Sequence, residues 1–558
     1  MKKQSASAIG IDLGTTNSAI AIWRNESAEL IPNALGHYLT PSVVSIDEHG
    51  QVLVGEAAHS RLITRPQETV AAFKRYMGTD KVITLGSQQY TPTELSSLVL
   101  QSLKADAEAY LGHSISEVVI SVPAYFSDQQ RKQVQLAAEL AGLDAVRLIN
   151  EPTAACLAHS LHQTHDRRFL VFDLGGGTFD VTVVEHQQGF VDVRASAGDN
   201  QLGGEDFTHQ LLAFVCQELE RSPETLTLAE KAKLVAACER AKKQPQNPVT
   251  IELTDPFNRT LTVTNEQLDT IWKDTLTRLS QPLRQAMGDA RISPQEIDEL
   301  IFVGGATHLK QVQQLATRLI GRFGSMELDP DLVVAMGAAT QAACRLRDEA
   351  VEEIVLTDVA PFSLGIAASR DNQTGIFTPI IERNTVVPTS RVERFYTLHD
   401  QQTVVNIEVY QGERLWVKEN IFIDNFEVKV PENDKGKEAI DVRFSYDING
   451  LLEVDVTILS TNETIQKVID RSPVGITDEM KAQSHARLAR LKIHQRDQLP
   501  NITLSEKLSR LYEEKLGWER HRVEELLLSF TQILETQDNE LIRQARTEIE
   551  KQLKELNL

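Results

Sequence analysis

FDLGGGTFD, residues 172–180, and IGIDLGTTNSAI, residues 9–20, are two copies of one phrase in a single chain. Each runs from an apolar stretch through Asp, Leu and Gly into small or hydroxyl residues, and then into a second apolar stretch. A turn rich in Gly and Thr presents backbone N–H groups that no side chain blocks, and such groups bind phosphate. The Lys-containing phosphate loop GxxxxGK[ST] is absent, so a phosphate site would have to be built from these turns.

The Asp in each copy, Asp12 or Asp173, ends the strand before the turn. A carboxylate repels phosphate, but it can hold Mg²⁺ through water, and Mg²⁺ prefers a few carboxylates together with phosphate oxygens. Two such hairpins facing each other across a cleft would grip a triphosphate from both sides. The duplication therefore indicates two α/β lobes of common origin. A tight β-hairpin without a ligand is the alternative for either copy taken alone.

The bulk properties argue against several classes of protein. With 558 residues the chain is too long for one hydrophobic core, so we expect several domains. A net charge of −22 argues against nucleic acid and anionic membranes as main partners. We find no apolar run of membrane-spanning length and no signal peptide, so we expect a cytoplasmic protein. The four cysteines form no CxxC pair and are expected to be reduced thiols.

Up to residue 352 strand-like and helix-like segments alternate, which indicates α/β layers. The apolar stretch 116–126 is predicted to be a buried strand. The helix after it has Ser127 placed to cap its start and Gly142 placed to end it. The segment that follows is predicted to be a strand, a turn at Pro152 and another helix.

The pattern changes after residue 350, where the chain becomes acidic, then apolar, and reaches Pro361. We interpret residues 353–360 as an interdomain linker. Period-two alternation dominates residues 361–476, which is typical of a β domain. The pair Asn449-Gly450 between two alternating runs is a strong hairpin signal.

The last part of the chain, residues 477–558, has helical periodicity. Thr477 can cap a first helix, with acidic residues in the first turn. Apolar residues mark one face of a later helix, as they would in the core of a small bundle. They are Val523, Leu526, Leu527, Phe530 and Leu534. Residues 1–352, which precede the predicted linker, are expected to form a separate domain.

Longer motifs occur in the same order as in a known family. They are FKRYMG (73–78), VISVPAYF (119–126), RLINEPTAA (147–155), GGEDFT (203–208), IFVGGAT (301–307), DPDLVVAMGAA (329–339), QGER (411–414) and FSYDINGLLEVDV (444–456). With the two glycine phrases, they make the chain resemble the DnaK-type heat-shock chaperone family over nearly its full length. The short C-terminus is most similar to that of specialised bacterial members.

The resemblance implies an α/β actin-like two-lobed ATPase domain at 1–352, followed by the linker. It then implies an all-β peptide-binding sandwich at 361–476 and a short α-helical lid at 477–558. The implied activity is hydrolysis of ATP coupled to the binding of unfolded or extended peptide segments of client proteins. ATP binding would open the peptide site and hydrolysis would close it. The implied cofactors are ATP, Mg²⁺ and K⁺.

In the family, the residues that match Asp12, Glu151 and Asp173 surround a hydrated Mg²⁺, and Asp180 with Asp12 helps to bind K⁺. Lys74 matches the catalytic Lys, which can orient the attacking water and neutralise charge on the γ-phosphate. Without the resemblance, Lys74 would be an ordinary surface Lys. The resemblance also assigns phosphate contacts to three loops. They would come from Gly14, Thr15, Thr16, Gly175, Gly176, Gly177, Thr178, Gly203 and Gly204, with Thr178 counted in the catalytic set.

The adenosine side would be built from Glu239, Lys242, Lys243, Gly304, Gly305 and Asp331. Here the chain departs from the family. Ala306 replaces the usual Ser and His308 replaces an Arg. Lys243 replaces a second Arg and Gln246 replaces a Ser. A guanidinium plane stacks on adenine, whereas Lys cannot stack in that way. We therefore predict weaker nucleotide binding than in a typical member.

Coupling between the two halves is also implied by matching residues. Pro123 and Arg131 match the proline and arginine that transmit the ATP state. The linker carries Leu356 and Asp358 as the family does, but Thr357 replaces a leucine. The lost apolar contact should weaken docking of the linker by ~1–2 kcal/mol.

The resemblance implies one protein partner, and a departure from the family argues against another. Arg147 matches a residue that meets the J-domain of a co-chaperone, so we expect a J-protein partner. The segment between ERAKK (239–243) and VTNEQL (263–268) is shorter than in DnaK itself, which has an extra hairpin there. That hairpin contributes to contact with the exchange factor GrpE. Its loss argues against dependence on an exchange factor of the GrpE type.

The peptide site would lie in the β domain, where an extended peptide binds by backbone hydrogen bonds and side-chain pockets. Ile366, Phe395, Val405 and Ile407 match pocket positions, and Leu398 falls where an arch residue closes over the peptide. Without the resemblance the pocket residues would be ordinary sandwich core. The short lid would retain substrates briefly and favour a narrow client range.

Three other functions were weighed. A sugar kinase of the same superfamily, or an actin-like filament protein, would lack the linker and the β domain. A relative that has lost its ATPase and only binds peptide would not need the catalytic set, which is present. That set is Asp12, Lys74, Glu151, Asp173 and Thr178. We therefore expect an ATP-dependent chaperone.

Overall fold

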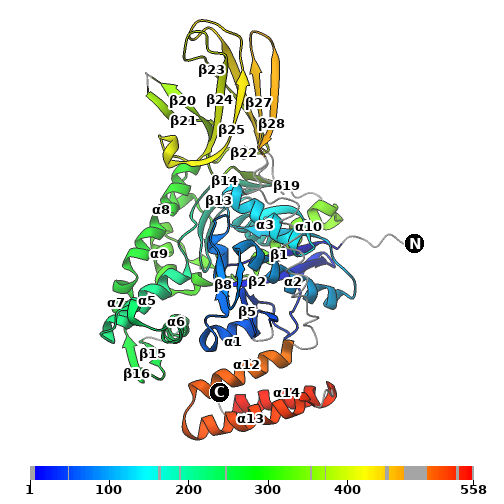
Figure 1. The fold of residues 1–558 in the computed structure, drawn as a ribbon, viewed down its shortest axis with the longest axis vertical. Helices are drawn as coiled ribbons and strands as arrows, with labels where there is room; N and C mark the ends of the chain where they lie inside the picture. Colours follow the sequence, from blue (N-terminus) through cyan, green and yellow to red (C-terminus); the bar gives the residue numbers. More distant parts are fainter. Residues whose placement is uncertain are drawn as a thin grey trace, which may run out of the picture.

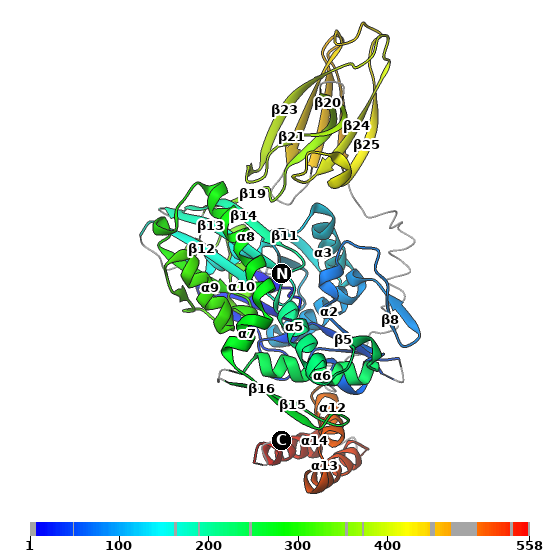
Figure 2. The same cartoon turned by 90° about the vertical axis from the view of Figure 1, so that its left-hand side faces the viewer.

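The structure is a computed structural model. It describes residues 7–47, 50–160, 165–187, 190–244, 248–351, 355–370, 373–446, 452–469, 499–535 and 539–555. An α/β body forms the middle of the molecule, with a β domain at one end of the long axis and a group of helices at the other (Figure 1). The view turned by 90° shows the same arrangement (Figure 2). Within the described ranges, no helix is long and apolar enough to cross a membrane.

The first lobe of the α/β body is built around one main sheet. Its strands are β1 (Ile9–Asp12), β2 (Asn17–Arg24), β3 (Ser27–Leu30), β4 (Thr40–Pro41), β10 (Glu117–Val122) and β11 (Asp144–Asn150). They are ordered β11-β10-β1-β2-β3, with β4 paired to β2. The first glycine phrase forms the β1–β2 hairpin, as predicted.

Smaller strands and three helices complete this lobe. The strands are β5 (Val43–Ile46), β6 (Val52–Val54), β7 (Thr69–Ala71), β8 (Ile83–Leu85) and β9 (Gln88–Tyr90). The helices are α1 (Glu56–Thr64), α2 (Pro92–Leu111) and α3 (Asp128–Leu140). The predicted start of α3 is confirmed, because Ser127 and Gln130 form a capping box. Gly142 follows the helix with a φ of 69°.

The second lobe carries the second glycine phrase in the hairpin between its first two strands. Its strands are β12 (Arg167–Leu174), β13 (Phe179–Gln187), β14 (Phe190–Asp199), β17 (Glu299–Val303) and β18 (Gly324–Ser325). Its helices are α5 (Gly204–Glu218), α6 (Leu228–Lys242), α7 (Asn265–Ile271), α8 (Lys273–Ala290) and α9 (Lys310–Ile320). The two phrases thus form equivalent hairpins in two lobes.

Two helices lie between the lobes, α4 (Glu151–Ser160) and α10 (Val333–Leu346). They pack on each other, α10 also on β1 and α4 also on β12. Glycines allow this close approach: a Cβ on Gly10 would lie 2.0 Å from Ala339 N, and one on Gly337 would lie 1.8 Å from Ala154 O. The turn predicted at Pro152 is wrong, because α4 begins directly after β11. Pro152 lies in the first helical turn. Backbone N–H groups there have no acceptor within the helix, so a proline, which lacks the N–H, costs no hydrogen bond.

The segment after Lys243 folds as a hairpin. Strands β15 (Val249–Leu253) and β16 (Arg259–Val263) pair there in antiparallel fashion. The lack of an extra hairpin relative to DnaK stays a prediction. Val249, Ile251 and Val263 are buried in the core of the second lobe. The core keeps this hairpin folded, and the predicted independence from a GrpE-type exchange factor stays a prediction.

The β domain consists of two four-stranded antiparallel sheets, ordered β21-β20-β24-β25 and β23-β26-β27-β28. Their strands are β20 (Leu364–Arg370), β21 (Gln373–Ile381), β23 (Thr389–Tyr396), β24 (Val404–Gln411), β25 (Ile421–Lys429), β26 (Ala439–Tyr446), β27 (Leu452–Ile458) and β28 (Glu463–Ile469). Alternate residues of β26 and β27 are buried, which confirms the period-two prediction. The Asn449-Gly450 turn lies outside the described residues.

The predicted linker is not an irregular connection. Its residues Val355–Val359 form strand β19, which pairs in parallel with β14 of the second lobe. On its other side β19 pairs with β22 (Val386–Val387), which belongs to the β domain. The seven-stranded sheet of the second lobe, β18-β17-β12-β13-β14-β19-β22, therefore continues into the β domain.

The C-terminal helices are α12 (Leu499–Glu514), α13 (Gly517–Glu535) and α14 (Asn539–Glu555). The predicted apolar face of α13 is confirmed, because Val523, Leu526 and Phe530 are buried in the core of this group. Helix α12 packs on α1 of the first lobe, where Arg61 Nη1 lies 2.8 Å from Glu506 Oε1. The predicted cap Thr477 lies outside the described residues.

Candidate functional site

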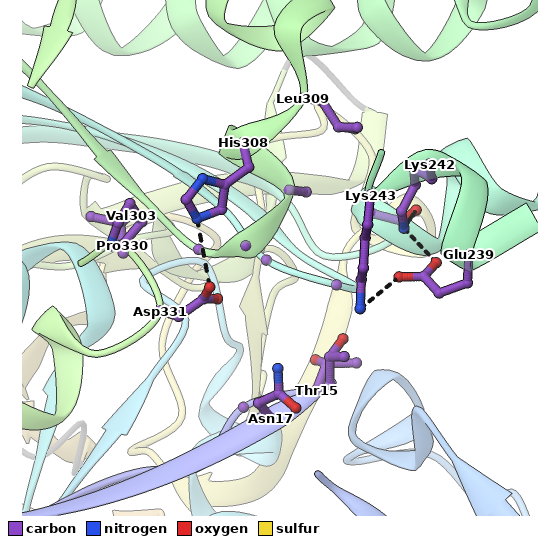
Figure 3. Close-up of a pocket in the computed structure, with 18 of the residues that line it drawn as sticks. Thr15, Asn17, Glu239, Lys242, Lys243, Val303, His308, Leu309, Pro330 and Asp331 are labelled. Atoms are coloured by element: carbon purple, nitrogen blue, oxygen red, sulfur yellow. Dashed lines mark hydrogen bonds and ion pairs between the residues drawn. The ribbon is translucent and has the colours of Figure 1, made fainter. Parts of the chain in front are cut away.

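A cavity of about 780 Å³ lies between the two lobes of the α/β body. Both glycine turns line it, together with residues of α6, of the turn after β17 and of the start of α10 (Figure 3). The two copies of the phrase therefore face one space, as the sequence predicted. A cavity of this size accommodates a ligand as large as a nucleotide.

Backbone packing around the turns leaves no room for side chains. A Cβ on Gly203 would lie 2.4 Å from Gly177 N, so the loop before α5 touches the second glycine turn. Gly304 has a φ of 80°, and a Cβ on it would lie 2.5 Å from Leu174 O. Both positions require glycine, and both bring backbone close to the cavity.

Three carboxylates gather at the ends of the hairpin strands. Asp12 accepts a hydrogen bond from Ser121 Oγ at 2.7 Å, and Asp173 lies opposite Asp180 across the β12–β13 ladder. Burial, and then the Glu151 carboxylate, raise the pKa of Asp12 to about 7 and the pKa of Asp180 to about 7. The same two causes raise the pKa of Asp173 well above its ordinary value. Like charges in a poorly solvated site oppose one another.

This carboxylate set fits a hard cation. Asp173 Oδ2 and Asp180 Oδ1 are buried and have no hydrogen-bond partner. A bound cation would offset the mutual repulsion of these oxygens, and hydrated Mg²⁺ takes few direct protein ligands. Asp12, Asp173 and Glu151 all line the cavity, whereas Asp180 lies behind it and accepts a hydrogen bond from Ala124 N at 2.9 Å.

Lys74 is not a surface residue. It lies in a short 3₁₀ turn, Phe73–Tyr76, and its Nζ is 3.0 Å from Glu151 Oε1. Its side chain is 3% exposed, and its Nζ lies 5.4 Å from the centroid of the Phe126 ring. This buried ammonium offsets part of the negative charge of Glu151, Asp12 and Asp173.

The opposite end of the cavity is polar and more open. Lys242 Nζ lies 2.6 Å from Glu239 Oε2 and donates to Gly204 O at 2.9 Å. Lys243 Nζ lies 3.3 Å from Glu239 Oε1 on the same helix end (Figure 3). Across the cavity, His308 Nε2 lies 3.7 Å from Asp331 Oδ2. Gln246 lies outside the described residues.

Most predicted nucleotide residues line the cavity. They are Asp12, Gly14, Thr15, Thr16, Glu151, Asp173, Gly175, Gly176, Gly204, Glu239, Lys242, Lys243, Gly304, Gly305 and Asp331. Lys74, Gly177, Thr178, Asp180 and Gly203 lie behind this lining. Sequence reasoning missed Leu268, Trp272 and Leu309, which also line it. Trp272 is fully buried and donates from Nε1 to Phe207 O at 3.0 Å, so no local pattern marks it as part of a site.

The sequence matches the family described as Hsp70 protein over residues 8–84 and 80–558. Three curated relatives are named chaperone protein DnaK, from Thermotoga petrophila, Thermotoga sp. strain RQ2 and Thermotoga maritima. Each is 39% identical over 500 residues, which is 86% of this chain and 83% of the relative. The chain is a DnaK-type member of the Hsp70 family.

Several predictions are thereby confirmed. Hsp70 proteins are ATP-dependent chaperones and ATPases that bind ATP with Mg²⁺, and they bind unfolded peptide segments and J-domain co-chaperones. The α/β body, the β-rich region and the C-terminal helices agree with the Hsp70 architecture. The sugar-kinase and filament alternatives are excluded by the family.

In this Hsp70 a run of contacts leads from the carboxylates to the linker strand. Ala124, just after Pro123, donates to Asp180 from its N–H and accepts from Arg131 Nη2 at 3.0 Å. Arg131 Nη2 also donates to Asn150 Oδ1 at 2.6 Å, and Asn150 Nδ2 donates to Asp358 Oδ2 at 2.7 Å. Two predicted coupling residues, Arg131 and Asp358, are therefore joined through Asn150, which the sequence did not single out.

The remaining residues predicted for coupling and peptide binding differ in how deeply they are buried. Arg147 is half-buried near Asp358, and burial lowers the pKa of its guanidinium. Leu356 packs at the edge of the core shared with α4 and α10. In the β domain Ile366 and Ile407 are buried in the sandwich core, and Phe395 and Val405 pack against it. Leu398 is 40% exposed at the end of the domain.

Nucleotide affinity should rise when His308 becomes Arg. His308 is exposed at the cavity rim, where a guanidinium would present a stacking plane and pair with Asp331. We expect the substitution His308→Arg to add about 1 kcal/mol of binding free energy, roughly a fivefold lower Kd for ATP. Isothermal titration calorimetry measures it, with His399→Arg on the β domain as the matched control. An unchanged or higher Kd would contradict this account of the rim.

Proposed function

We propose that residues 1–352 bind and hydrolyse ATP in the cavity between the lobes. Asp12, Glu151 and Asp173 would hold hydrated Mg²⁺, Asp180 with Asp12 would bind K⁺, and Lys74 would orient the attacking water. The observation that carries this assignment is that Asp173 Oδ2 and Asp180 Oδ1 are buried without a hydrogen-bond partner, an environment that suits contact with a cation. Three phosphate loops and the Glu239–Lys242–Lys243 group would hold the nucleotide.

We further propose that ATP state is passed to residues 361–476 through residues 353–360. The contacts Asp180–Ala124–Arg131–Asn150–Asp358 form the first route. They support the proposal because one end touches the cation carboxylates and the other end is the linker strand. Pro123, which immediately precedes Ala124, would set the backbone direction of this route.

A second junction supports the same proposal. Arg383 of the β domain donates to Asp289 at the end of α8 from both Nε and Nη2, each at 2.9 Å. Asn384 Nδ2 donates to the same carboxylate at 2.9 Å, and the rings of Tyr125 and Phe362 lie 4.3 Å apart. Hydrogen bonding to Asp289 raises the pKa of the Arg383 guanidinium. A charged pair held by two bonds fixes orientation as well as adding energy.

In this arrangement the β domain is docked on the second lobe, and α12–α14 rest on the first lobe at the far end (Figure 1). ATP would favour this docked state, in which the helices are away from the β domain. ADP would favour an undocked state in which residues 477–558 act as the lid. A ligand shifts such an equilibrium only by its difference in affinity for the two states.

The peptide site would use Ile366, Phe395, Val405 and Ile407, with Leu398 in the arch. Because Ile366 and Ile407 are buried here, a peptide side chain would need these strands to repack before it could enter. We propose a specialised member of the HscC type with a narrow client range, acting in the cytoplasm. A J-protein would bind near Arg147, and the need for a GrpE-type exchange factor is left to measurement.

The test is release of a fluorescent apolar peptide on addition of ATP. Wild type should release it quickly, and Thr178→Ala in the second glycine turn should slow or abolish this release. Arg383→Ala should leave ATP hydrolysis intact and slow release about five- to tenfold, because it removes the docking contact with Asp289. It also removes the ion pair of Arg383 with Glu413 inside the β domain. Arg391→Ala, which changes an exposed Arg of the same domain, is the matched control.

Each outcome has a meaning. Release in wild type that is lost in Thr178→Ala establishes a coupled cycle. Peptide binding that ignores ATP in wild type would mean that the halves do not communicate, and a binder that has lost ATP control would replace the chaperone cycle. Normal release in Arg383→Ala would show that this junction does not contribute to coupling.

A further inference from the structure

The linker strand carries a polar residue where an apolar one was expected. In the parallel ladder between β14 and β19, Asp192 is the direct register partner of Thr357. Thr357 Oγ1 donates a hydrogen bond to Asp192 Oδ1. The register fixes both side chains on the same face of the sheet, so this bond belongs to the docked position of the linker and cannot form when β19 leaves β14.

The acceptor Asp192 is itself paired with an arginine of its own strand. Arg194 Nη1 lies 3.2 Å from Asp192 Oδ2, and Arg194 Nε lies 3.8 Å from Glu185 Oε2. Glu185 Oε1 in turn lies 2.7 Å from Arg168 Nε. Asp192 therefore presents one oxygen to the linker while its other oxygen is paired on its own strand. A carboxylate kept in place in this way needs no reordering when the linker arrives.

The chemistry favours Thr over an apolar residue at this position. A hydroxyl that donates to a carboxylate makes a charge-assisted hydrogen bond, roughly twice as strong as a neutral one. A leucine at position 357 would cover Asp192 Oδ1 without giving it a partner, and an unsatisfied acceptor costs free energy. The two residues thus suit each other, and neither suits an apolar partner.

We propose that Thr357 and Asp192 form a matched positioning pair that fixes the docked register of the linker strand in this chain. The pair replaces, rather than merely loses, the apolar contact that the sequence led us to expect. Docking then depends on one hydroxyl and one carboxylate. This inference rests on the proposed coupling through residues 353–360 and adds the contact that specifies it.

The experiment is a double-mutant cycle on the full chain, read by hydrogen exchange of the backbone amides of β19. Wild type with ATP should protect these amides more strongly than wild type with ADP. Thr357→Val removes the hydroxyl with little change in shape, and should speed exchange in ATP by about tenfold. Asp192→Ala should have a similar effect, and the double variant should be no worse than either single one.

Three further variants separate loss of a specific hydrogen bond from general damage to the fold. Thr357→Ser keeps a hydroxyl and should retain most of the protection, while Thr357→Leu combined with Asp192→Val should recover protection that Thr357→Leu alone loses. The matched control is Thr262→Val on β16, which makes the same chemical change at an exposed strand position. ATP-triggered peptide release should follow the same order as amide protection.

The outcomes distinguish the two proposals. If wild type shows no difference between ATP and ADP at β19, the coupling itself fails. If wild type is protected by ATP but Thr357→Val is equally protected, or if the effects of Thr357→Val and Asp192→Ala simply add, the pair fails while the coupling stands.

Discussion

The substitution Lys74→Met is expected to lower kcat for ATP hydrolysis by on the order of 10²–10³, the effect of removing one electrostatic contact to the transition state. Lys74 is buried, and its Nζ is 3.0 Å from Glu151 Oε1 in the wall of the cavity. Met keeps the apolar stem and removes the charge. Single-turnover hydrolysis of bound ATP measures the chemical step without contributions from product release.

A structural cause can be separated from a catalytic one. Loss of the ammonium leaves Glu151 buried without its cation, which by itself destabilises the fold. The double variant Lys74→Met/Glu151→Gln removes that stress, so its thermal stability should recover while hydrolysis stays low. Lys81→Met, at an exposed Lys nearby in the chain, is the matched control. Hydrolysis restored in the double variant would show that Lys74 serves only to neutralise Glu151.

The substitution Asp173→Asn is expected to have opposite effects on stability and activity. Burial and neighbouring carboxylates raise the pKa of Asp173, so its ionised form is disfavoured in the protein without metal. Because the pKa of Asp173 is raised in the folded protein, ionising this carboxyl lowers the free energy of unfolding. The contribution of Asp173 to that free energy is therefore present in full at low pH and is lost as the pH rises through the folded-state pKa. Asn carries no charge, and the melting temperature in EDTA at pH 7.5 should therefore rise or stay unchanged.

With Mg²⁺ and ATP present, Asp173→Asn should instead perform worse than wild type. The variant should lose ATP hydrolysis by about 10² or more, because the carboxylate that we propose orients the hydrated cation is gone. It should also lose most of the rise in melting temperature that Mg²⁺ with ATP gives wild type. Asp80→Asn, at an exposed Asp, should behave as wild type. A variant that melts lower in EDTA would show that Asp173 stabilises the fold rather than the ligand.

The sequence predicted what is encoded locally. The two hairpins follow from the glycine phrases, the start of α3 follows from Ser127 and Gln130, and the sandwich strands follow from period-two alternation. Each of these signals lies within about ten residues, so the neighbouring residues suffice to specify it. The position of Pro152 was misjudged because the same residue suits both a turn and a first helical turn.

What the sequence alone did not reveal depends on residues far apart. Residues 355–359 look like a linker, and only the free edge of β14 makes them a strand. Arg61 meets Glu506 across 445 residues of sequence, and no periodicity relates the two. Trp272, at the junction of α7 and α8, packs on Phe207 of α5 and lines the cavity. The hydrogen bond of Thr357 was missed for the same reason, since its partner Asp192 lies on another strand.

The sheet that continues from the second lobe into the β domain also has a mechanical meaning. Strand β19 is held by three register pairs to β14 and by two to β22. Tension on a client segment gripped by the β domain would run through this strand, and the short ladder to β22 would yield first. The ladders within the second lobe and the β domain, such as β12–β13 and β26–β27, are far longer. The molecule would then part at this seam with each half still folded, and could close again when the load ends.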